Sequence, residues 1–172
     1  APMAAIAEGV FFTRDLTNEP ANVLTTDDFA ARLAAMQELG LDVEILEEAD
    51  LVKLGMRTLL SVGQGSDSPS KVVVMSWNGG GKEAPFALVG KGVVFDTGGI
   101  SMKPAAGMED MTMDMGGAGV VAGVMRTLAR LCAREADTAA AAHAEIGAAG
   151  ARRGRDAVVG IRRAGNIGED AP

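Results

Sequence analysis

Two lysines and two aspartates follow one another in a stretch of the chain whose residue types suit metal-ion chemistry. Lys91 and Asp96 flank the apolar run Val93–Phe95. Lys103 and Asp114 follow further along, the latter directly before a predicted helix. Hard divalent cations favour carboxylate oxygens, and zinc accepts them together with nitrogen. Because a lysine amine ligates a metal only when its pKa is lowered, the pattern allows lysine as a ligand or as a charged partner.

The same four residues also allow an ordinary structural interpretation. In it, Lys91–Asp96 and Lys103–Asp114 form two ion pairs and bind nothing, since structural ion pairs are common. Their position at the end of a buried strand favours a ligand, because ligands in open α/β sheets gather there. Two glycines directly after Asp96 permit a sharp turn at that point. Spacing alone leaves both interpretations open.

The elements that must position these residues alternate between helix and strand. Apolar spacing predicts helices over 1–18, from Thr25 to about Gly40, over Glu47–Leu54 and from Gly116 to about Cys132. Strands are predicted at Asp42–Leu46, Thr58–Val62, Lys71–Trp77, Phe86–Val89 and Val93–Phe95. The first helix is expected to carry an apolar stripe of Ile6, Val10, Phe11 and Leu16. The alternation predicts the α/β class, with a mixed central sheet and helices on both faces.

Composition narrows the classes of partner. The chain has 172 residues, enough for one domain with a core. A net charge of -7, with five Phe, one Trp and no Tyr, argues against nucleic acid as a partner. No apolar run approaches the roughly 20 residues of a membrane span. A single cysteine, Cys132, suits a reducing compartment, so we expect a cytoplasmic protein without a membrane partner.

Four sequence segments carry a resemblance to a known family. The run VGKGVVFDTGGISMKP, followed by MTMDMGGA, closely resembles the signature of the leucyl (cytosol) aminopeptidase family. Weaker similarity in RDLTNEPANVLTTDDFA and LGMRTLLSVGQGS extends the resemblance over roughly residues 8–131. It implies a two-metal enzyme, using manganese or zinc, that removes N-terminal amino acids, preferably leucine, from peptide substrates. It also implies a homo-hexamer, with a bicarbonate as a possible base in the intact family.

The resemblance implies a role for each matching residue. Lys91 would be a ligand of the more tightly bound metal ion, Asp96 would bridge both metal ions, and Asp114 would complete the first site with a further acidic group. Lys103 would be catalytic and would stabilise the oxyanion that forms on the substrate carbonyl. Met111 would line the pocket for the N-terminal side chain, although a buried helical methionine is nearly as simple an interpretation.

A second family motif, Asn-Thr-Asp-Ala-Glu-Gly-Arg, supplies further ligands and is missing from this sequence. Residues 1–132 are therefore interpreted as part of a catalytic domain, a fragment with the first metal-binding motif. Residues 133–172 form an Ala/Gly/Arg-rich tail of uncertain structure, hypothesised to arise from a frameshift. We expect weak binding of the first metal, a reduced or absent second metal, and no activity. The alternative is a non-catalytic remnant that acts as an assembly or binding module.

Two enzyme alternatives are weaker. The sequence has one cysteine, Cys132, and one histidine, His143, which could form a nucleophile–base pair. A buried cysteine at the end of an apolar helix is the simpler interpretation. The glycine clusters at 63–65, 79–81 and 90–92 invite phosphate binding. None fits a complete phosphate-loop or dinucleotide pattern, which favours tight turns between strands.

Overall fold

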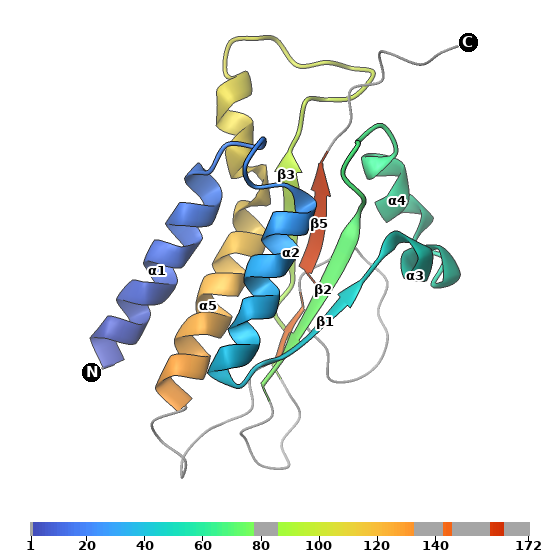
Figure 1. Ribbon diagram of the computed structural model, residues 1–172. Helices are drawn as coiled ribbons and strands as arrows, with labels where there is room; N and C mark the ends of the chain where they lie inside the picture. The colour runs from blue at the N-terminus through green and yellow to red at the C-terminus, as the bar shows by residue number, and fades with distance from the viewer. Residues whose placement is uncertain (1, 78–85, 133–142, 146–158, 164–172) are drawn as a thin grey trace.

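A central sheet with helices on both faces forms the fold (Figure 1). The computed structural model describes residues 2–77, 86–132, 143–145 and 159–163. The strands are β1 (Asp42–Leu46), β2 (Lys71–Ser76), β3 (Gly90–Phe95), β4 (His143–Glu145) and β5 (Val159–Arg163). The helices are α1 (Pro2–Asn18), α2 (Thr26–Ala34), α3 (Glu48–Lys53), α4 (Arg57–Gly63) and α5 (Gly116–Cys132), with 3-10 helices η1 (Ala35–Leu39) and η2 (Met108–Met115). The α/β prediction is confirmed.

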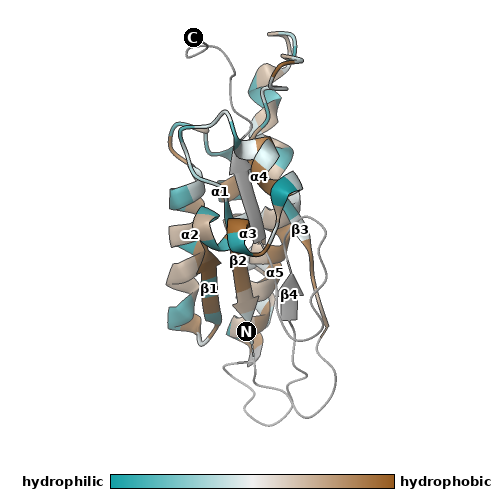
Figure 2. Cartoon of the chain, turned by 90° about the vertical axis from the view of Figure 1, so that its right-hand side faces the viewer, coloured by the Kyte–Doolittle hydropathy of each residue, from teal (hydrophilic) through white to brown (hydrophobic). Residues whose placement is uncertain are grey.

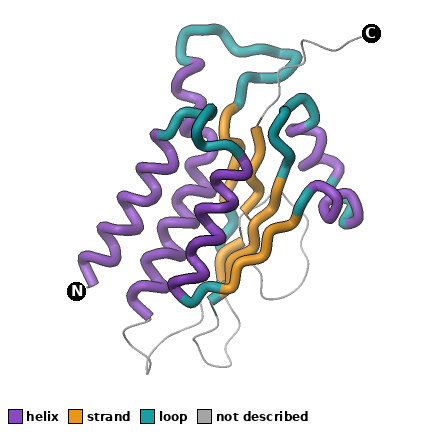
Figure 3. Tube along the Cα trace, in the orientation of Figure 1, coloured by secondary structure: helices purple, strands orange, loops and turns teal. Residues whose placement is uncertain are grey.

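The sheet is mixed, as predicted. Its order is β1-β2-β5-β3, and β4 also pairs with β2. β2 runs antiparallel to β1, with Asp42 opposite Ser76, and antiparallel to β5, whereas β3 and β5 are parallel. Figure 3 shows the strands side by side, with α1, α2 and α5 on one side and α3 and α4 on the other. β4 and β5 belong to the tail 133–172, so this tail contributes backbone to the sheet.

Strand β2 supplies side chains to two separate cores. Val73 and Met75 belong to a large cluster with α2 and α5 that includes Phe29 and Met125. Val72 and Val74 belong to a smaller cluster, with Leu51 of α3 and Leu59 of α4. Successive side chains of a strand point to opposite faces, so an unbroken apolar strand must be covered on both. The hydrophobic colouring of β2 between the helical layers shows this arrangement (Figure 2).

Helices α1 and α5 pack through small residues. A Cβ added at Gly9 would lie 2.5 Å from the carbonyl oxygen of Gly123, so the two backbones touch. The predicted apolar stripe is therefore wrong except at Leu16, which is fully buried. Ile6, Val10 and Phe11 are 44%, 50% and 59% exposed, because the contact with α5 uses Ala5 and Gly9 instead. Glycine allows this close approach, which large side chains would prevent.

Two strand predictions are wrong. Thr58–Val62 lies within helix α4, where Leu59 packs on the β2 face; short apolar runs do not distinguish helix from strand by periodicity. Phe86–Val89 contains only an isolated bridge at Phe86, and β3 begins at Gly90. Phe86 and Val89 are 67% and 59% exposed, so this run is not a buried strand. No helix among the described residues is long and apolar enough to span a membrane.

The start of α2 carries a reciprocal cap at Thr25, where the sequence predicted the helix to begin. The Oγ1 atom of Thr25 accepts a hydrogen bond from the Asp28 N–H at 3.2 Å, and the Asp28 carboxylate accepts one from the Thr25 N–H at 3.3 Å. This reciprocal pair satisfies two N–H groups that the helix leaves free. Gly40, with φ of 84°, ends η1 in a left-handed conformation. The helix boundaries on this side of the sheet thus follow from local sequence.

Lys71 joins three elements at the end of the sheet where β1 stops. Its side chain is 7% exposed, and its Nζ atom forms ion pairs with Asp27 of α2 at 2.9 Å and with Glu47. Burial is the largest single influence and lowers the pKa of Lys71, but the hydrogen bonds and the negative charges of Glu47 and Asp27 together outweigh it, so the pKa is raised above its ordinary value. A raised folded-state pKa means that the ammonium form stabilises the fold.

We predict that Lys71→Met lowers the free energy of unfolding by about 1 kcal/mol at neutral pH, because both ion pairs of Lys71 are lost. The loss stays small because the two exposed carboxylates regain water. The stabilisation by Lys71 is complete below the pKa that Lys71 has in the unfolded chain. It disappears as the pH rises through the higher pKa that Lys71 has in the folded protein. The difference between wild type and variant should therefore shrink in alkaline solution, as measured by urea unfolding. Lys53→Met is the matched control, because Lys53 pairs with Asp50 at the surface and is 74% exposed. Equal losses in both variants at neutral pH would contradict the prediction.

Candidate metal site

The four charged residues identified in the sequence form two ion pairs beside β3: Lys91, the second residue of the strand, pairs with Asp114, and Asp96, directly after its last residue, pairs with Lys103. Asp96 directly follows β3, and the loop after it returns to place Lys103 beside it. Two hydrogen bonds hold this loop: the Gly98 N–H donates to Asp96 Oδ1 at 2.9 Å, and the Lys103 N–H donates to the Thr97 carbonyl at 2.9 Å. Gly98 has φ of 95°, a conformation that favours glycine. The backbone turn thus fixes Asp96 and Lys103 relative to each other.

The Lys103 ammonium group sits on Asp96. Its Nζ atom donates to Asp96 Oδ2 at 2.8 Å and to the Asp96 carbonyl at 3.1 Å. It also lies 3.0 Å from Met111 Sδ, within η2. The side chains of Lys103 and Asp96 are 35% and 32% exposed, so the pair is only partly open to water. Lys103 therefore contacts both Asp96, which is expected to bridge the metal ions, and Met111, which is expected to line the substrate pocket.

Lys91 pairs with Asp114 across from β3 to η2. Its Nζ atom forms an ion pair with Asp114 Oδ2 and donates to the Asp114 carbonyl at 3.1 Å. The structural interpretation drawn from the sequence paired Lys91 with Asp96 and Lys103 with Asp114, and that pairing is wrong. The partners are exchanged because the loop turns back after Asp96 and brings Lys103, and not Lys91, onto that carboxylate. Asp114 lies within the 3-10 helix η2, which ends directly before α5, so it precedes the long helix as the sequence predicted.

Electrostatics join the two pairs into one cluster. The hydrogen bond from Lys103 holds the pKa of Asp96 below its usual value, although partial burial acts in the opposite direction. The Gly98 N–H and the charges of Lys103 and Lys91 lower the pKa of Asp96 further. Lys91 thus acts on both carboxylates. Asp96 is an anion at neutral pH, which is the protonation state that a metal ligand requires.

The donor set suits one divalent cation but is incomplete. Asp96 and Asp114 supply oxygen donors, and Lys91 supplies a nitrogen that must lose its proton to bind. Among the residues that the structure describes, no group of three or more His, Cys, Asp or Glu side chains is placed to share a metal ion. Two carboxylates with two lysines therefore fit a partial site.

The sequence analysis missed a further polar group beside the cluster. The Oγ1 atom of Thr97, directly after Asp96, is buried and has no hydrogen-bond partner in the described part of the chain. A threonine beside a ligand carries no sequence signal of its own. The side chains of Cys132 and His143 and the glycines 79–81 lie outside what the structure describes, so the two enzyme alternatives stay untested there.

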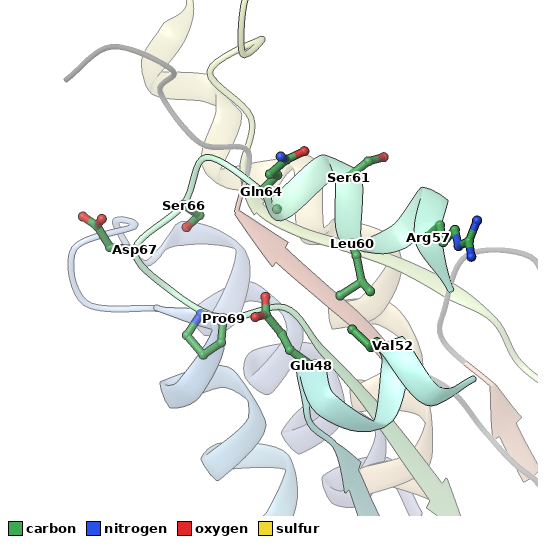
Figure 4. Close-up of a pocket in the computed structure, with 10 residues that line it drawn as sticks. Glu48, Val52, Arg57, Leu60, Ser61, Gln64, Ser66, Asp67 and Pro69 are labelled. Carbon is green, nitrogen blue, oxygen red and sulfur yellow. The ribbon is translucent and has the colours of Figure 1, made fainter. Parts of the chain in front are cut away.

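A separate cavity of about 520 Å³ lies by α3, α4 and the loop that leads to β2 (Figure 4). The side chains of Val52, Leu60 and Glu48 face one another across it, whereas that of Arg57 points away. Its lining, among the described residues, contains none of the four charged residues of the candidate site. Its full lining is Glu48, Val52, Arg57, Leu60, Ser61, Gly63, Gln64, Ser66, Asp67 and Pro69.

Sequence relatives agree on one family. A probable cytosol aminopeptidase of Cereibacter sphaeroides is 79% identical over 134 residues, and one of Dinoroseobacter shibae is 81% identical over 125 residues. These alignments cover 77% and 73% of this chain but 27% and 26% of the relatives. The chain thus spans about a quarter of the length of the curated relatives that it matches.

Solved structures give the same result for the fold. The leucine aminopeptidase of Caenorhabditis elegans matches with a TM-score of 0.78 and 28% identity, over 98% of this chain and 32% of that one. The bottromycin maturation enzyme BotP, in complex with Mn, matches with a TM-score of 0.77 and 32% identity, over 95% and 32%. A sequence model described as "Cytosol aminopeptidase family, catalytic domain" matches residues 11–158. The chain belongs to the cytosol aminopeptidase family.

Proposed function

We propose that this chain holds the first half of the ligand set of a two-metal aminopeptidase and is inactive by itself. The observation that carries the proposal is the presence of two ion pairs beside the same strand, Lys91–Asp114 and Lys103–Asp96. Membership of the family supports the reaction class, the hydrolysis of N-terminal residues, with leucine preferred, from peptides. The cytosol in the relatives' names supports a cytoplasmic location.

In the proposed site, Asp96, Asp114 and Lys91 would hold the first metal ion, and Asp96 would also be a ligand of the second. Bound divalent cations supply a water of lowered pKa and polarise the substrate carbonyl. Manganese and zinc both accept this donor set, and manganese is present in the matched BotP structure. The hexameric assembly and the bicarbonate of the intact family belong to this proposal as well.

Lys103 has one role in the structure and a second role in the proposed reaction. Its ammonium pairs with Asp96 at 2.8 Å. With Asp96 serving as a metal ligand, the Lys103 side chain would turn to the substrate and donate to the developing oxyanion. A charged donor aimed at such an oxygen contributes about 3–4 kcal/mol to lowering a barrier. Met111, in contact with Lys103 Nζ, is then placed to touch the substrate's N-terminal side chain.

The expected inactivity follows from the number of ligands. Without the motif Asn-Thr-Asp-Ala-Glu-Gly-Arg, the first site lacks one carboxylate and the second retains Asp96 alone. We further propose that residues 133–172 stem from a frameshift after about Leu131, where the Ala/Gly/Arg-rich composition begins. Translation of the gene and its downstream DNA in all frames tests this origin, and absence of the motif from every frame would refute it.

We predict that the chain binds one Mn²⁺ ion weakly and does not hydrolyse leucyl amides. Paramagnetic resonance of free Mn²⁺ during a titration measures the stoichiometry and affinity. Asp96→Asn and Asp114→Asn should each abolish binding, because each removes one of two carboxylate ligands. The matched control Asp50→Asn should leave binding unchanged, since Asp50 pairs with Lys53 within α3 and not with the charged residues beside β3. Hydrolysis of leucyl amides by the pure chain, or binding that survives Asp96→Asn, would contradict the proposal.

We also predict that Lys103→Gln raises the pKa of Asp96 towards its ordinary value and strengthens Mn²⁺ binding. The lysine supplies the largest contribution that lowers this pKa, and its charge competes with a cation for the same carboxylate. Carboxyl-detected nuclear magnetic resonance titration gives the pKa, and calorimetry gives the affinity. Lys53→Gln is the control and should alter neither quantity. An unchanged Asp96 titration in Lys103→Gln would exclude the direct ion pair.

A further inference from the structure

Strand β3 and helix α5 touch through their backbones at two glycines. A Cβ added at Gly90 would lie 2.4 Å from the carbonyl oxygen of Gly117 and 2.8 Å from the amide nitrogen of Ala118. A Cβ added at Gly117 would lie 2.9 Å from the amide nitrogen of Lys91. Real Cβ atoms are not found so close to backbone atoms, so any side chain would force the strand and helix apart.

Each glycine of this contact lies close in sequence to one of the proposed metal ligands. Lys91 directly follows Gly90 on β3, and Asp114 precedes Gly117 by less than one helical turn. The Lys91 Nζ atom reaches both the carboxylate and, at 3.1 Å, the carbonyl oxygen of Asp114. The separation of strand and helix therefore sets the separation of these two side chains.

Backbone conformation does not demand glycine at either position. The glycines with positive φ in the described residues are Gly40, Gly55, Gly98, Gly99 and Gly107. Gly90 lies in an extended strand and Gly117 in the first turn of α5, where other residues are conformationally accepted. The close contact is what excludes a side chain there.

We propose that Gly90 and Gly117 are positioning residues that hold Lys91 and Asp114 at the distance the first metal site needs. The inference rests on the proposed function and extends it to two residues that touch no ligand. An added methyl group at this contact would push α5 away from β3. Asp114, just before α5, would then move away from Lys91 and Asp96. Metal affinity depends on such supporting contacts as strongly as on the orientation of a ligand.

Helix α5 supplies two matched controls for the same substitution. A Cβ at Gly116, next to Gly117, would meet nothing within 4 Å. A Cβ at Gly123 would lie 2.6 Å from the Gly9 carbonyl oxygen and 2.1 Å from Thr13 Oγ1, at the contact with α1. Gly116→Ala therefore adds a methyl group without a clash. Gly123→Ala produces a comparable clash two turns away from the metal ligands.

The experiment compares Gly117→Ala, Gly116→Ala and Gly123→Ala in the full chain by Mn²⁺ titration, with circular dichroism to confirm folding. We expect Gly117→Ala to weaken Mn²⁺ binding by about tenfold or more. Gly116→Ala and Gly123→Ala should bind as wild type, even where Gly123→Ala lowers the melting temperature. Gly90→Ala, which meets the same contact from the strand, should repeat the effect and serves if Gly117→Ala does not fold.

A second measurement separates this inference from the proposed function. Acetylation of Lys91, followed by mass spectrometry, reports its ion pair with Asp114 without any metal. Its reactivity should rise in Gly117→Ala and stay at the wild-type level in Gly116→Ala. If wild type binds no Mn²⁺ but Lys91 reactivity rises as expected, the proposed function fails and the positioning role stands. Equal Lys91 reactivity in Gly117→Ala and Gly116→Ala would overturn the positioning role.

Discussion

The direct backbone contact between β3 and the first turn of α5 is the constraint on which the site depends. Gly90 and Gly117 allow the strand and the helix to touch, and this contact brings Lys91 of β3 to Asp114 of η2. The other side of α5 meets α1 by the same means, through Gly123 and Gly9. Helix α5 is thus held between β3 and α1 at distances that only small residues permit, and the charged cluster lies where its first turn meets the sheet.

Charge balance stabilises both ion pairs beside β3. A partly buried carboxylate is costly to keep as an anion unless a positive charge lies beside it. Lys103 on Asp96 and Lys91 on Asp114 neutralise both anions, and Lys91 also lowers the pKa of Asp96. Lys103 therefore favours the ionised form of Asp96, and Lys91 holds Asp114 in place through its ion pair. A cation that enters must displace ammonium groups, so the same residues that preserve the site also compete with its metal.

Much of the fold was predictable from local signals, and the exceptions have physical causes. Strand β1 was predicted with its observed limits, and the Thr25 cap was recognised, because both follow from short-range patterns. Helix α4 was mistaken for a strand, since five apolar-rich residues fit either period. The outward position of Val10 could not be foreseen, because it follows from the contact between Gly9 and Gly123, which joins distant parts of the chain.

The residues of the proposed site were selected by their types and by family resemblance, but their pairing depends on tertiary geometry. The turn after Asp96 decides that Lys103 reaches its carboxylate, and spacing along the chain favoured Lys91 instead. The most direct test of the account is a crystal structure of the chain soaked in Mn²⁺, with anomalous scattering recorded at the manganese edge. We predict one peak in contact with both Asp96 and Asp114. We also predict that the Lys103 ammonium is turned away from Asp96. A map without a peak there, with both ion pairs intact at high Mn²⁺ concentration, would contradict it.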